Sequence, residues 1–196
     1  MIFLIRHGET DANAARIVQT PDVALSARGR EQACALGRRL ADAGIATIVS
    51  SDLRRAVETA EIVAAATGAP IRFDADLQER NFGDVRGTAY ADLAEDLFGP
   101  EFAPPGGETW AQFHARVDHA WARVLAIAAD VAGDLAVVTH GLVCRAVVQR
   151  HCDVAAASDI PLAWGNTAVT ILEPPRGVRL LGCTAHLDDV PGGGAV

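Results

Sequence analysis

The chain has 196 residues, of which 50% are hydrophobic and 21% charged, and its formal net charge at pH 7 is −8. This length and balance predict one globular domain with a substantial buried core. The acidic balance argues against nucleic acid or an anionic membrane as the main partner, because both repel a protein of the same sign. It also makes any local group of arginines and histidines informative about an anionic ligand.

Metal and membrane signals are weak. The four cysteines form no C-x-x-C pair and are expected to be small core residues in a reducing compartment: Cys34, Cys144, Cys152 and Cys183. His114 and His119 are five residues apart, not the four that place two ligands on one helix face, so no zinc site is expected. No segment reaches the roughly 18 apolar residues of a membrane span. The first apolar run is too short for a signal peptide. We therefore expect a cytoplasmic protein without metal.

The first ten residues place reactive side chains directly after a short apolar run. Residues 1–5 are expected to form a buried strand. Arg6, His7 and Gly8 follow at its carboxyl end, where open α/β sheets bind their ligands. His7 can be a nucleophile, Arg6 can hold an oxyanion, and Gly8 lets a ligand approach the backbone. On these residues alone, a buried structural histidine beside an ion-paired arginine is an equal alternative.

The same layout occurs a second time, far along the chain. Residues 135–138 are apolar and are expected to form a strand that ends in Thr139, His140 and Gly141. If the two strands are neighbours, His7 and His140 lie at the same edge of the sheet. Two imidazoles and an arginine at one edge require a ligand or a paired acid.

The segment after the first histidine is polar. Residues 11–22 are expected to form a loop beside the site, in which Asn13 can donate its amide to a phosphate or simply stabilise a turn. Ser26 is expected to cap a helix with apolar residues at helical spacing that ends near Gly44.

A second strand and helix follow. Residues 45–49 are expected to form the strand, and Ser50 or Ser51 to cap a helix that stops at the Gly-Ala-Pro run of residues 68–70. Residues 71–73 are expected to form a third short strand.

Two arginines, Arg54 and Arg55, fall in the first turn of that helix, where the helix dipole disfavours cations. An anion bound at the helix start would remove the conflict. Alternatively, Asp52 neutralises Arg55 and Glu58 neutralises Arg54 along the helix. These residues by themselves favour the ion pairs.

The middle of the chain contains one further candidate. Residues 77–84 are expected to form a loop in which Glu79 is a candidate proton donor, although a lone loop glutamate is usually a solvated surface charge. Residues 88–98 are expected to form a short helix and residues 99–107 an ordered loop; whether that loop moves on ligand binding is left open. Residues 108–129 have the pattern of a long amphipathic helix.

The last third completes the predicted fold. Residues 142–151 are expected to form a helix, and residues 167–173 and 178–186 a hairpin around Pro174-Pro175-Arg176-Gly177. We therefore predict an α/β fold with a mostly parallel sheet and at least one antiparallel strand. Residues 1–187 are predicted to be a single domain and residues 188–196 a loose tail.

Five blocks, in order along nearly the whole chain, resemble the signature of the histidine phosphatase superfamily, the phosphoglycerate-mutase-like enzymes. The blocks are Arg6-His7-Gly8-Glu9-Thr10 with Asn13, Ser51-Asp52-Leu53-Arg54-Arg55-Ala56, Leu77-Gln78-Glu79 with Phe82-Gly83-Asp84 and Gly87, Pro105-Gly106-Gly107-Glu108-Thr109, and Val138-Thr139-His140-Gly141. One block is a modest hint, whereas five in order are specific. The resemblance implies a three-layer α/β/α fold.

The resemblance also implies a mechanism. Neutral His7 attacks phosphorus and forms a phosphohistidine, and Glu79 protonates the leaving alkoxide. Arg6, Arg55 and His140 surround the phosphoryl oxygens. The remaining residues implied to bind phosphate or substrate are Asn13, Gln19 and Gly141. No metal or cofactor is required.

Three positions depart from the family pattern and border the expected substrate. Val85 stands where a tryptophan is common, Arg86 where an acid is common, and Thr20 where a glycine is usual after Gln19. These departures do not affect the predicted chemistry, but they make the substrate harder to predict from the family pattern.

The leading functional prediction is a phosphatase acting on a small phosphorylated metabolite. The alternatives are a phosphoglycerate mutase and a non-catalytic phospho-ligand binder. A mutase needs cations for a second anionic group, and the stretch Gly87 to Glu108 has no Lys or Arg, which favours hydrolysis. An α-ribazole phosphatase of cobalamin assembly and a broad-specificity sugar phosphatase remain open as substrate classes, and a homodimer as the assembly.

Overall fold

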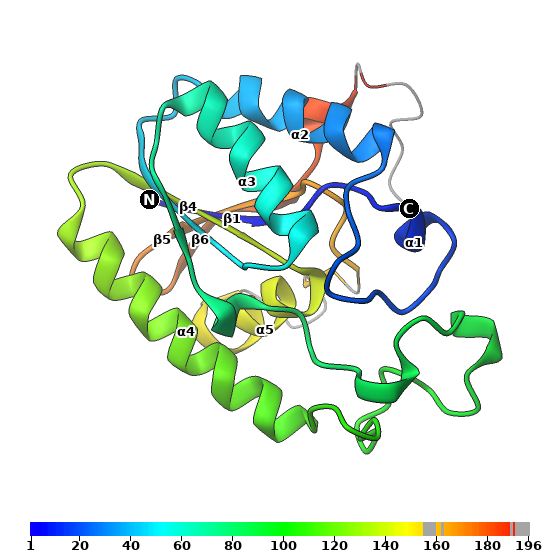
Figure 1. Ribbon diagram of the computed structural model, residues 1–196. Helices are drawn as coiled ribbons and strands as arrows, with labels where there is room; N and C mark the ends of the chain where they lie inside the picture. The colour runs from blue at the N-terminus through cyan, green and yellow to red at the C-terminus, as the bar shows by residue number, and fades with distance from the viewer. Residues whose placement is uncertain (155–159, 162, 189, 191–196) are drawn as a thin grey trace.

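The computed structural model describes residues 1–154, 160–161, 163–188 and 190. Within them, six strands form one sheet in the order β3-β2-β4-β1-β5-β6 (Figure 1). Their bounds are β1 Ile2–Arg6, β2 Ile45–Ser50, β3 Ile71–Phe73, β4 Asp134–Thr139, β5 Val169–Glu173 and β6 Gly177–Cys183. The β1–β4, β2–β4 and β2–β3 pairs are parallel, and β5 runs antiparallel to β1 and β6. The predicted mostly parallel sheet with an antiparallel strand is confirmed.

Helices cover both faces of this sheet, which confirms the three-layer α/β/α architecture (Figure 1). On one face lie α2 (Ala27–Leu40) and α3 (Arg54–Thr67), and on the other α4 (Trp110–Asp130) and α5 (Gly141–His151). Each face has its own apolar core, since successive residues of a strand point to opposite sides. In β1, Ile2 and Leu4 pack with the α4–α5 core, whereas Phe3 and Ile5 pack with the α2–α3 core.

The two strands that carry the histidines are neighbours. Arg6 at the end of β1 is opposite Thr139 at the end of β4. The His7 N–H continues the ladder by donating to the Thr139 carbonyl at 2.9 Å. The prediction that both strand ends meet at one edge of the sheet is confirmed.

The start of α2 and the end of α3 follow the prediction, whereas α2 ends at Leu40 and not near Gly44. Ser26 caps α2 by accepting a hydrogen bond from the Gly29 N–H at 2.9 Å, and Gly68 ends α3 in the left-handed conformation with φ of 73°. The prediction that Ser50 or Ser51 caps α3 is wrong: the N-cap residue is Leu53, which provides no side-chain hydrogen bond. The Ser51 hydroxyl lies instead 2.9 Å from His140 Nε2.

Residues 88–98 do not form the predicted helix. They contain only the short 3₁₀ turn η3 (Tyr90–Asp92), and the backbone at the start of this stretch pairs with another segment. The Tyr90 N–H donates to the Arg16 carbonyl at 2.9 Å, and Ile17 and Ala89 form an isolated antiparallel bridge. Nearby, Phe82 and Leu97 belong to a small separate apolar cluster.

Other short elements connect the layers. The predicted loop 11–22 begins with the four-residue helix α1 (Asp11–Ala14). The remaining 3₁₀ turns are η1 (Ala75–Leu77), η2 (Gly83–Val85) and η5 (Ala185–Leu187). A capping box of Thr109 and Gln112 starts α4, and β5 and β6 form the predicted hairpin.

The predicted tail falls mostly outside the described part of the chain. Of the predicted tail, residues 189 and 191–196 lie outside it, and Val190 is buried. Among the described residues, no helix combines the length and apolar character needed to cross a membrane.

Candidate active site

Two buried imidazoles face each other where β1 and β4 end. His7 follows β1, and His140 is the N-cap residue of α5 directly after β4. Their ring centroids are 5.1 Å apart with an interplanar angle of 58°. Both side chains are almost fully shielded, at 2% and 0% exposed.

The hydrogen bonds of His7 define which ring nitrogen is free. Nδ1 lies 2.6 Å from the carbonyl oxygen of Gly8. A carbonyl can only accept, so Nδ1 carries the proton and Nε2 keeps an unshared electron pair. Burial lowers the pKa of His7 well below 6.5, and the charges of Arg55 and Arg6 lower it further. His7 is therefore a neutral imidazole at pH 7, the form that a nucleophile requires.

The two ring nitrogens of His140 have different surroundings. Its Nε2 lies 2.9 Å from the Ser51 hydroxyl, while its buried Nδ1 has no hydrogen-bond partner among the described residues. Burial lowers the pKa of His140 well below 6.5, with Arg55 and His7 contributing. A buried polar nitrogen without a partner is costly, so Nδ1 is suited to contact a polar ligand.

Arg6 and Arg55 bring positive charge to the imidazoles. Arg6 Nη1 donates to the Trp164 carbonyl, and Arg55 Nη1 donates to the Thr20 carbonyl at 3.1 Å. The Nε atoms of both arginines are buried without a partner among the described residues. Burial lowers the pKa of Arg55 to about 10, so it remains a cation at pH 7. Each guanidinium thus has donor capacity left for an anion.

The ion-pair interpretation of the α3 arginines is right for one and wrong for the other. Arg54 pairs with Glu58 at 2.9 Å and is exposed. Arg55 is 2% exposed and makes no ion pair with Asp52, whose carboxylate instead accepts a hydrogen bond from Gln78 at 2.7 Å. Adjacent residues in one helix turn therefore have different surroundings, because Arg55 points into the protein.

Glu79 lies in the loop after η1, and its carboxylate contacts the first turn of α5. Its Oε2 accepts from the Leu142 N–H at 3.1 Å and its Oε1 from the Arg80 N–H at 3.0 Å. Burial raises the pKa of Glu79 above 4.5, while these N–H groups, Arg55 and Arg6 oppose the shift. A carboxyl group with a raised pKa near the two site arginines is suited to give and take a proton.

The other predicted binding residues are arranged around this group. Asn13 Oδ1 accepts from Asn166 Nδ2 at 3.3 Å, and Gln19 Oε1 accepts from Thr10 Oγ1 at 2.9 Å. Gly141 packs against Arg6, where an added Cβ would lie 3.6 Å from Arg6 Nε. The structure does not test the roles predicted for these residues.

Several partners of the site were not predicted from the sequence. The Trp164 carbonyl orients Arg6, and Asn166 donates to the His7 carbonyl at 3.1 Å. Both residues lie in an irregular stretch without a motif, so no local signal marks them. Ser51, which contacts His140, belongs to the second sequence block, although the local pattern predicts a helix cap at this position. Among the described residues, no three His, Cys, Asp or Glu side chains gather as a metal site requires.

A six-stranded mixed sheet between two helical layers is the fold of the phosphoglycerate-mutase-like proteins, and a solved phosphoglycerate mutase shares it with a TM-score of 0.79. Residues 2–182 match the histidine phosphatase superfamily (branch 1), and the chain belongs to this family.

Relatives of this chain have more than one activity in their names. A protein of Salmonella paratyphi B named "Probable phosphoglycerate mutase GpmB" is 31% identical over 95% of this chain and 94% of its own length. A mycobacterial glucosyl-3-phosphoglycerate phosphatase, solved with inorganic phosphate, is 28% identical, with a TM-score of 0.78 over 94% of this chain and 98% of that one. An Escherichia coli structure provisionally named an α-ribazole-5′-P phosphatase is 26% identical, with a TM-score of 0.77 over 94% and 96%.

Proposed function

We propose that this protein is a phosphomonoester hydrolase that acts on a small phosphorylated metabolite through a phosphohistidine on His7. The observation that carries the proposal is the pairing of two buried, neutral imidazoles 5.1 Å apart. Hydrogen bonding to Gly8 leaves Nε2 of the first imidazole free to attack. Arg6 and Arg55 supply the positive charge that a phosphoryl group requires.

In the first half-reaction, His7 Nε2 attacks phosphorus and the ester P–O bond breaks. The leaving alkoxide takes the proton of Glu79, and the phosphoryl group stays on His7. Arg6, Arg55 and His140 surround the three phosphoryl oxygens, so their charges and hydrogen bonds stabilise the loose transition state.

In the second half-reaction, water attacks the phosphohistidine and Glu79, now a carboxylate, takes a proton from that water. The P–N bond breaks, which frees His7 and releases inorganic phosphate. Splitting the displacement into two steps lets one carboxyl group act first as acid and then as base.

Hydrolysis is favoured over the mutase alternative by the distribution of charge. A mutase must keep a bisphosphorylated intermediate bound while that intermediate reorients in the site. This requires cations around the second anionic group of the intermediate. The stretch from Gly87 to Glu108, between the proposed proton donor and the second histidine, contains no Lys or Arg. The phosphatases among the relatives support the same choice.

The proposed substrate class is a phosphorylated sugar or nucleoside-like alcohol. The relatives named for glucosyl-3-phosphoglycerate and for α-ribazole-5′-P support it, since both names describe phosphate esters of primary alcohols in molecules that contain a sugar, on the glycerate in the first and on the ribose in the second. A kinetic screen of small phosphomonoesters, α-ribazole phosphate and sugar phosphates included, would choose between them.

The test of the proposed function is turnover of p-nitrophenyl phosphate in the presence of EDTA. We expect wild-type activity, a loss of at least about 10³-fold in His7→Ala, and ³²P from labelled substrate trapped on His7 after acid-free quenching. His119→Ala, at an exposed position of α4, is the matched control. Activity of His7→Ala within tenfold of wild type would rule out the nucleophile.

A second assay separates the two enzyme classes. Incubation with 3-phosphoglycerate and a bisphosphoglycerate primer should release inorganic phosphate and form little 2-phosphoglycerate. Isomerisation faster than phosphate release would show that the protein is a mutase. Phosphate binding without any turnover would show that it is a non-catalytic binder.

A further inference from the structure

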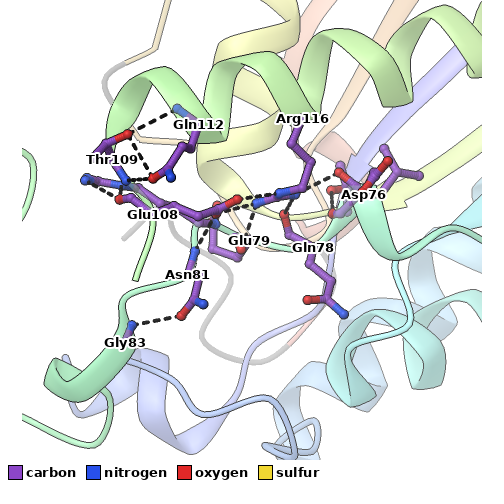
Figure 2. Close-up of polar contacts among 12 residues, drawn as sticks. Asp76, Gln78, Glu79, Asn81, Gly83, Glu108, Thr109, Gln112 and Arg116 are labelled. Atoms are coloured by element: carbon purple, nitrogen blue, oxygen red, sulfur yellow. Dashed lines mark hydrogen bonds and ion pairs between the residues drawn. The ribbon is translucent and has the colours of Figure 1, made fainter. Parts of the chain in front are cut away.

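An ion pair next to Glu79 belongs to neither the phosphate site nor the protein surface. Glu108 directly precedes Thr109, the N-cap residue of α4, and Arg116 lies further along that helix (Figure 2). Arg116 Nε to Glu108 Oε1 and Arg116 Nη2 to Glu108 Oε2 are both 2.7 Å, and each side chain is 18% exposed. A two-pronged pair of this kind is among the strong polar contacts.

The other donors of Arg116 hold the backbone that carries Glu79 (Figure 2). Nη1 donates to the carbonyls of Asp76 and Gln78, both at 2.8 Å, and Nη2 donates to the Glu79 carbonyl at 3.3 Å. Together with the two bonds to Glu108, every one of the five N–H donors of this guanidinium has an acceptor within the protein. Arg116 therefore has no donor left for a substrate phosphate.

Glu108 also holds this loop, through Asn81, which lies two residues after Glu79. Its Oε2 accepts from the Asn81 N–H at 2.8 Å, and its own N–H donates to the Asn81 carbonyl at 2.8 Å. Its carbonyl accepts from Arg80 Nε at 3.0 Å and from Nη2 at 2.9 Å. The Arg80 guanidinium also stacks on Trp110, 3.9 Å from the ring centroid. The backbone is thus fixed on both sides of Glu79.

The fixed backbone determines where the carboxyl group of Glu79 lies. One oxygen is held by the Arg80 N–H within the loop, and the other by the Leu142 N–H of α5. A shift of the loop would lengthen the contact across to α5. Proton transfer requires hydrogen-bond distance to the leaving oxygen, and a misplacement of ~1 Å can lower a rate by about 10²-fold.

We infer that Glu108 and Arg116 are positioning residues, which hold the Glu79 loop so that its carboxyl group can protonate the leaving group, and that they do not bind substrate. This inference rests on the proposed function, in which Glu79 is the proton donor. It assigns the acid of the Gly-Gly-Glu-Thr block to the support of catalysis.

The test compares a poor and a good leaving group in Arg116→Lys and in the isosteric Glu108→Gln. Glycerol phosphate needs protonation of its alkoxide, whereas p-nitrophenolate leaves with little help. We expect the ratio of kcat/KM for p-nitrophenyl phosphate to that for glycerol phosphate to rise by about tenfold. Inhibition by inorganic phosphate should change by less than about twofold, because the arginines of the phosphate site are untouched.

Two controls separate positioning from general loosening of the fold. Arg123→Gln removes an exposed α4 arginine that pairs with Asp74 at 2.9 Å and Asp76 at 2.7 Å, and it should leave the ratio unchanged. In a Glu79→Gln background the Arg116→Lys change should cost nothing further, because no proton donor remains to be positioned. A folding defect would instead add to the loss.

The outcomes are distinguishable. An unchanged leaving-group ratio in active variants, additive losses in the double variant, or weaker phosphate inhibition would overturn the positioning role while the proposed function stands. Glu108→Gln decides the matter should Arg116→Lys fail to fold. A wild-type protein that hydrolyses neither ester would overturn the proposed function and this inference with it.

Discussion

At the scale of single residues, burial sets the protonation of the histidines. Water is excluded from His7 and His140, and the nearby Arg55 and Arg6 add positive charge. Both effects disfavour the imidazolium form. The site therefore combines neutral imidazoles with two cationic arginines, an arrangement suited to bind an anion.

This protonation makes stability depend on pH. In the unfolded chain His7 has the ordinary pKa of 6.5, whereas in the folded protein its pKa is well below that value. Below pH 6.5, His7 binds a proton in the unfolded state but stays neutral in the folded state, so the free energy of unfolding falls as pH falls. Between pH 6.5 and 5.5, His7→Asn should lose about 1 kcal/mol less stability than wild type in urea unfolding. His119→Asn is the control, and an equal change there would contradict the assignment.

Glu79 has the opposite shift and a kinetic consequence. Burial raises the pKa of its carboxyl group, so the proton-donating form persists to higher pH and is lost as pH rises through that raised pKa. For glycerol phosphate, kcat/KM should therefore decline on the alkaline side. Glu79→Gln should remove this decline and lower kcat/KM by about 10²-fold or more. If p-nitrophenyl phosphate suffers the same loss, Glu79 is not the proton donor.

Residue surroundings were harder to predict than residue identities. The strand-His-Gly pattern placed His7 and His140 at one edge, because buried strands and their ends are readable from a short apolar run. For Arg55, the local sequence by itself favours an ion pair with Asp52 and only the family resemblance indicates the site, because tertiary packing is what turns this side chain inward. Trp164 contacts Arg6 through its backbone carbonyl, an atom that every residue has, so its identity gave no signal.

At the scale of elements, the first turn of α3 presents one cation to solvent and the next to the site. Arg54 pairs with Glu58 at the surface, while Arg55 is buried with an unpartnered Nε among the described residues. An anion near this helix start would relieve the unfavourable contact of Arg55 with the helix dipole.

The two arginines make a matched pair of variants. Arg55→Gln should raise the inhibition constant of inorganic phosphate or vanadate by about tenfold or more, since a charge-assisted hydrogen bond contributes ~1.5–3 kcal/mol. Arg54→Gln should leave it within about twofold, because exposed ion pairs contribute little. Equal inhibition of both variants would return Arg55 to a structural role.

Elements with strong periodicity were predictable, and those defined by distant pairing were not. The helix α4 has apolar residues on one side and a capping box, both visible in the sequence. Residues 88–98 carry helix-compatible residues, yet the backbone of residues 88–90 pairs with residues 16–18. Likewise, the ion pair of Glu108 with Arg116 joins the fourth sequence block to α4, and Arg116 also donates to the carbonyls of Gln78 and Glu79, about 30 residues earlier. Such contacts depend on tertiary structure rather than on local propensity.

At the scale of the whole molecule, an acidic protein concentrates cations in one buried place. The formal net charge is −8, yet Arg6 and Arg55 lie together beside two imidazoles. Their unpartnered Nε atoms and His140 Nδ1 carry a desolvation cost in the free protein. A bound phosphate would satisfy these atoms and neutralise the charge, so ligand binding and global stability should be coupled.

The size of that coupling follows from mass action. Inorganic phosphate at 100 times its Kd should stabilise the folded state by about 2.7 kcal/mol. For a protein of this length, that corresponds to a rise in Tm of about 5–10 °C. The measurement is a thermal melt against phosphate concentration at constant ionic strength, with chloride as the reference salt. Arg55→Gln should lose most of the shift and Arg54→Gln should keep it. An equal shift in chloride would mean that the cations are screened nonspecifically, and the buried anion site would then be wrong.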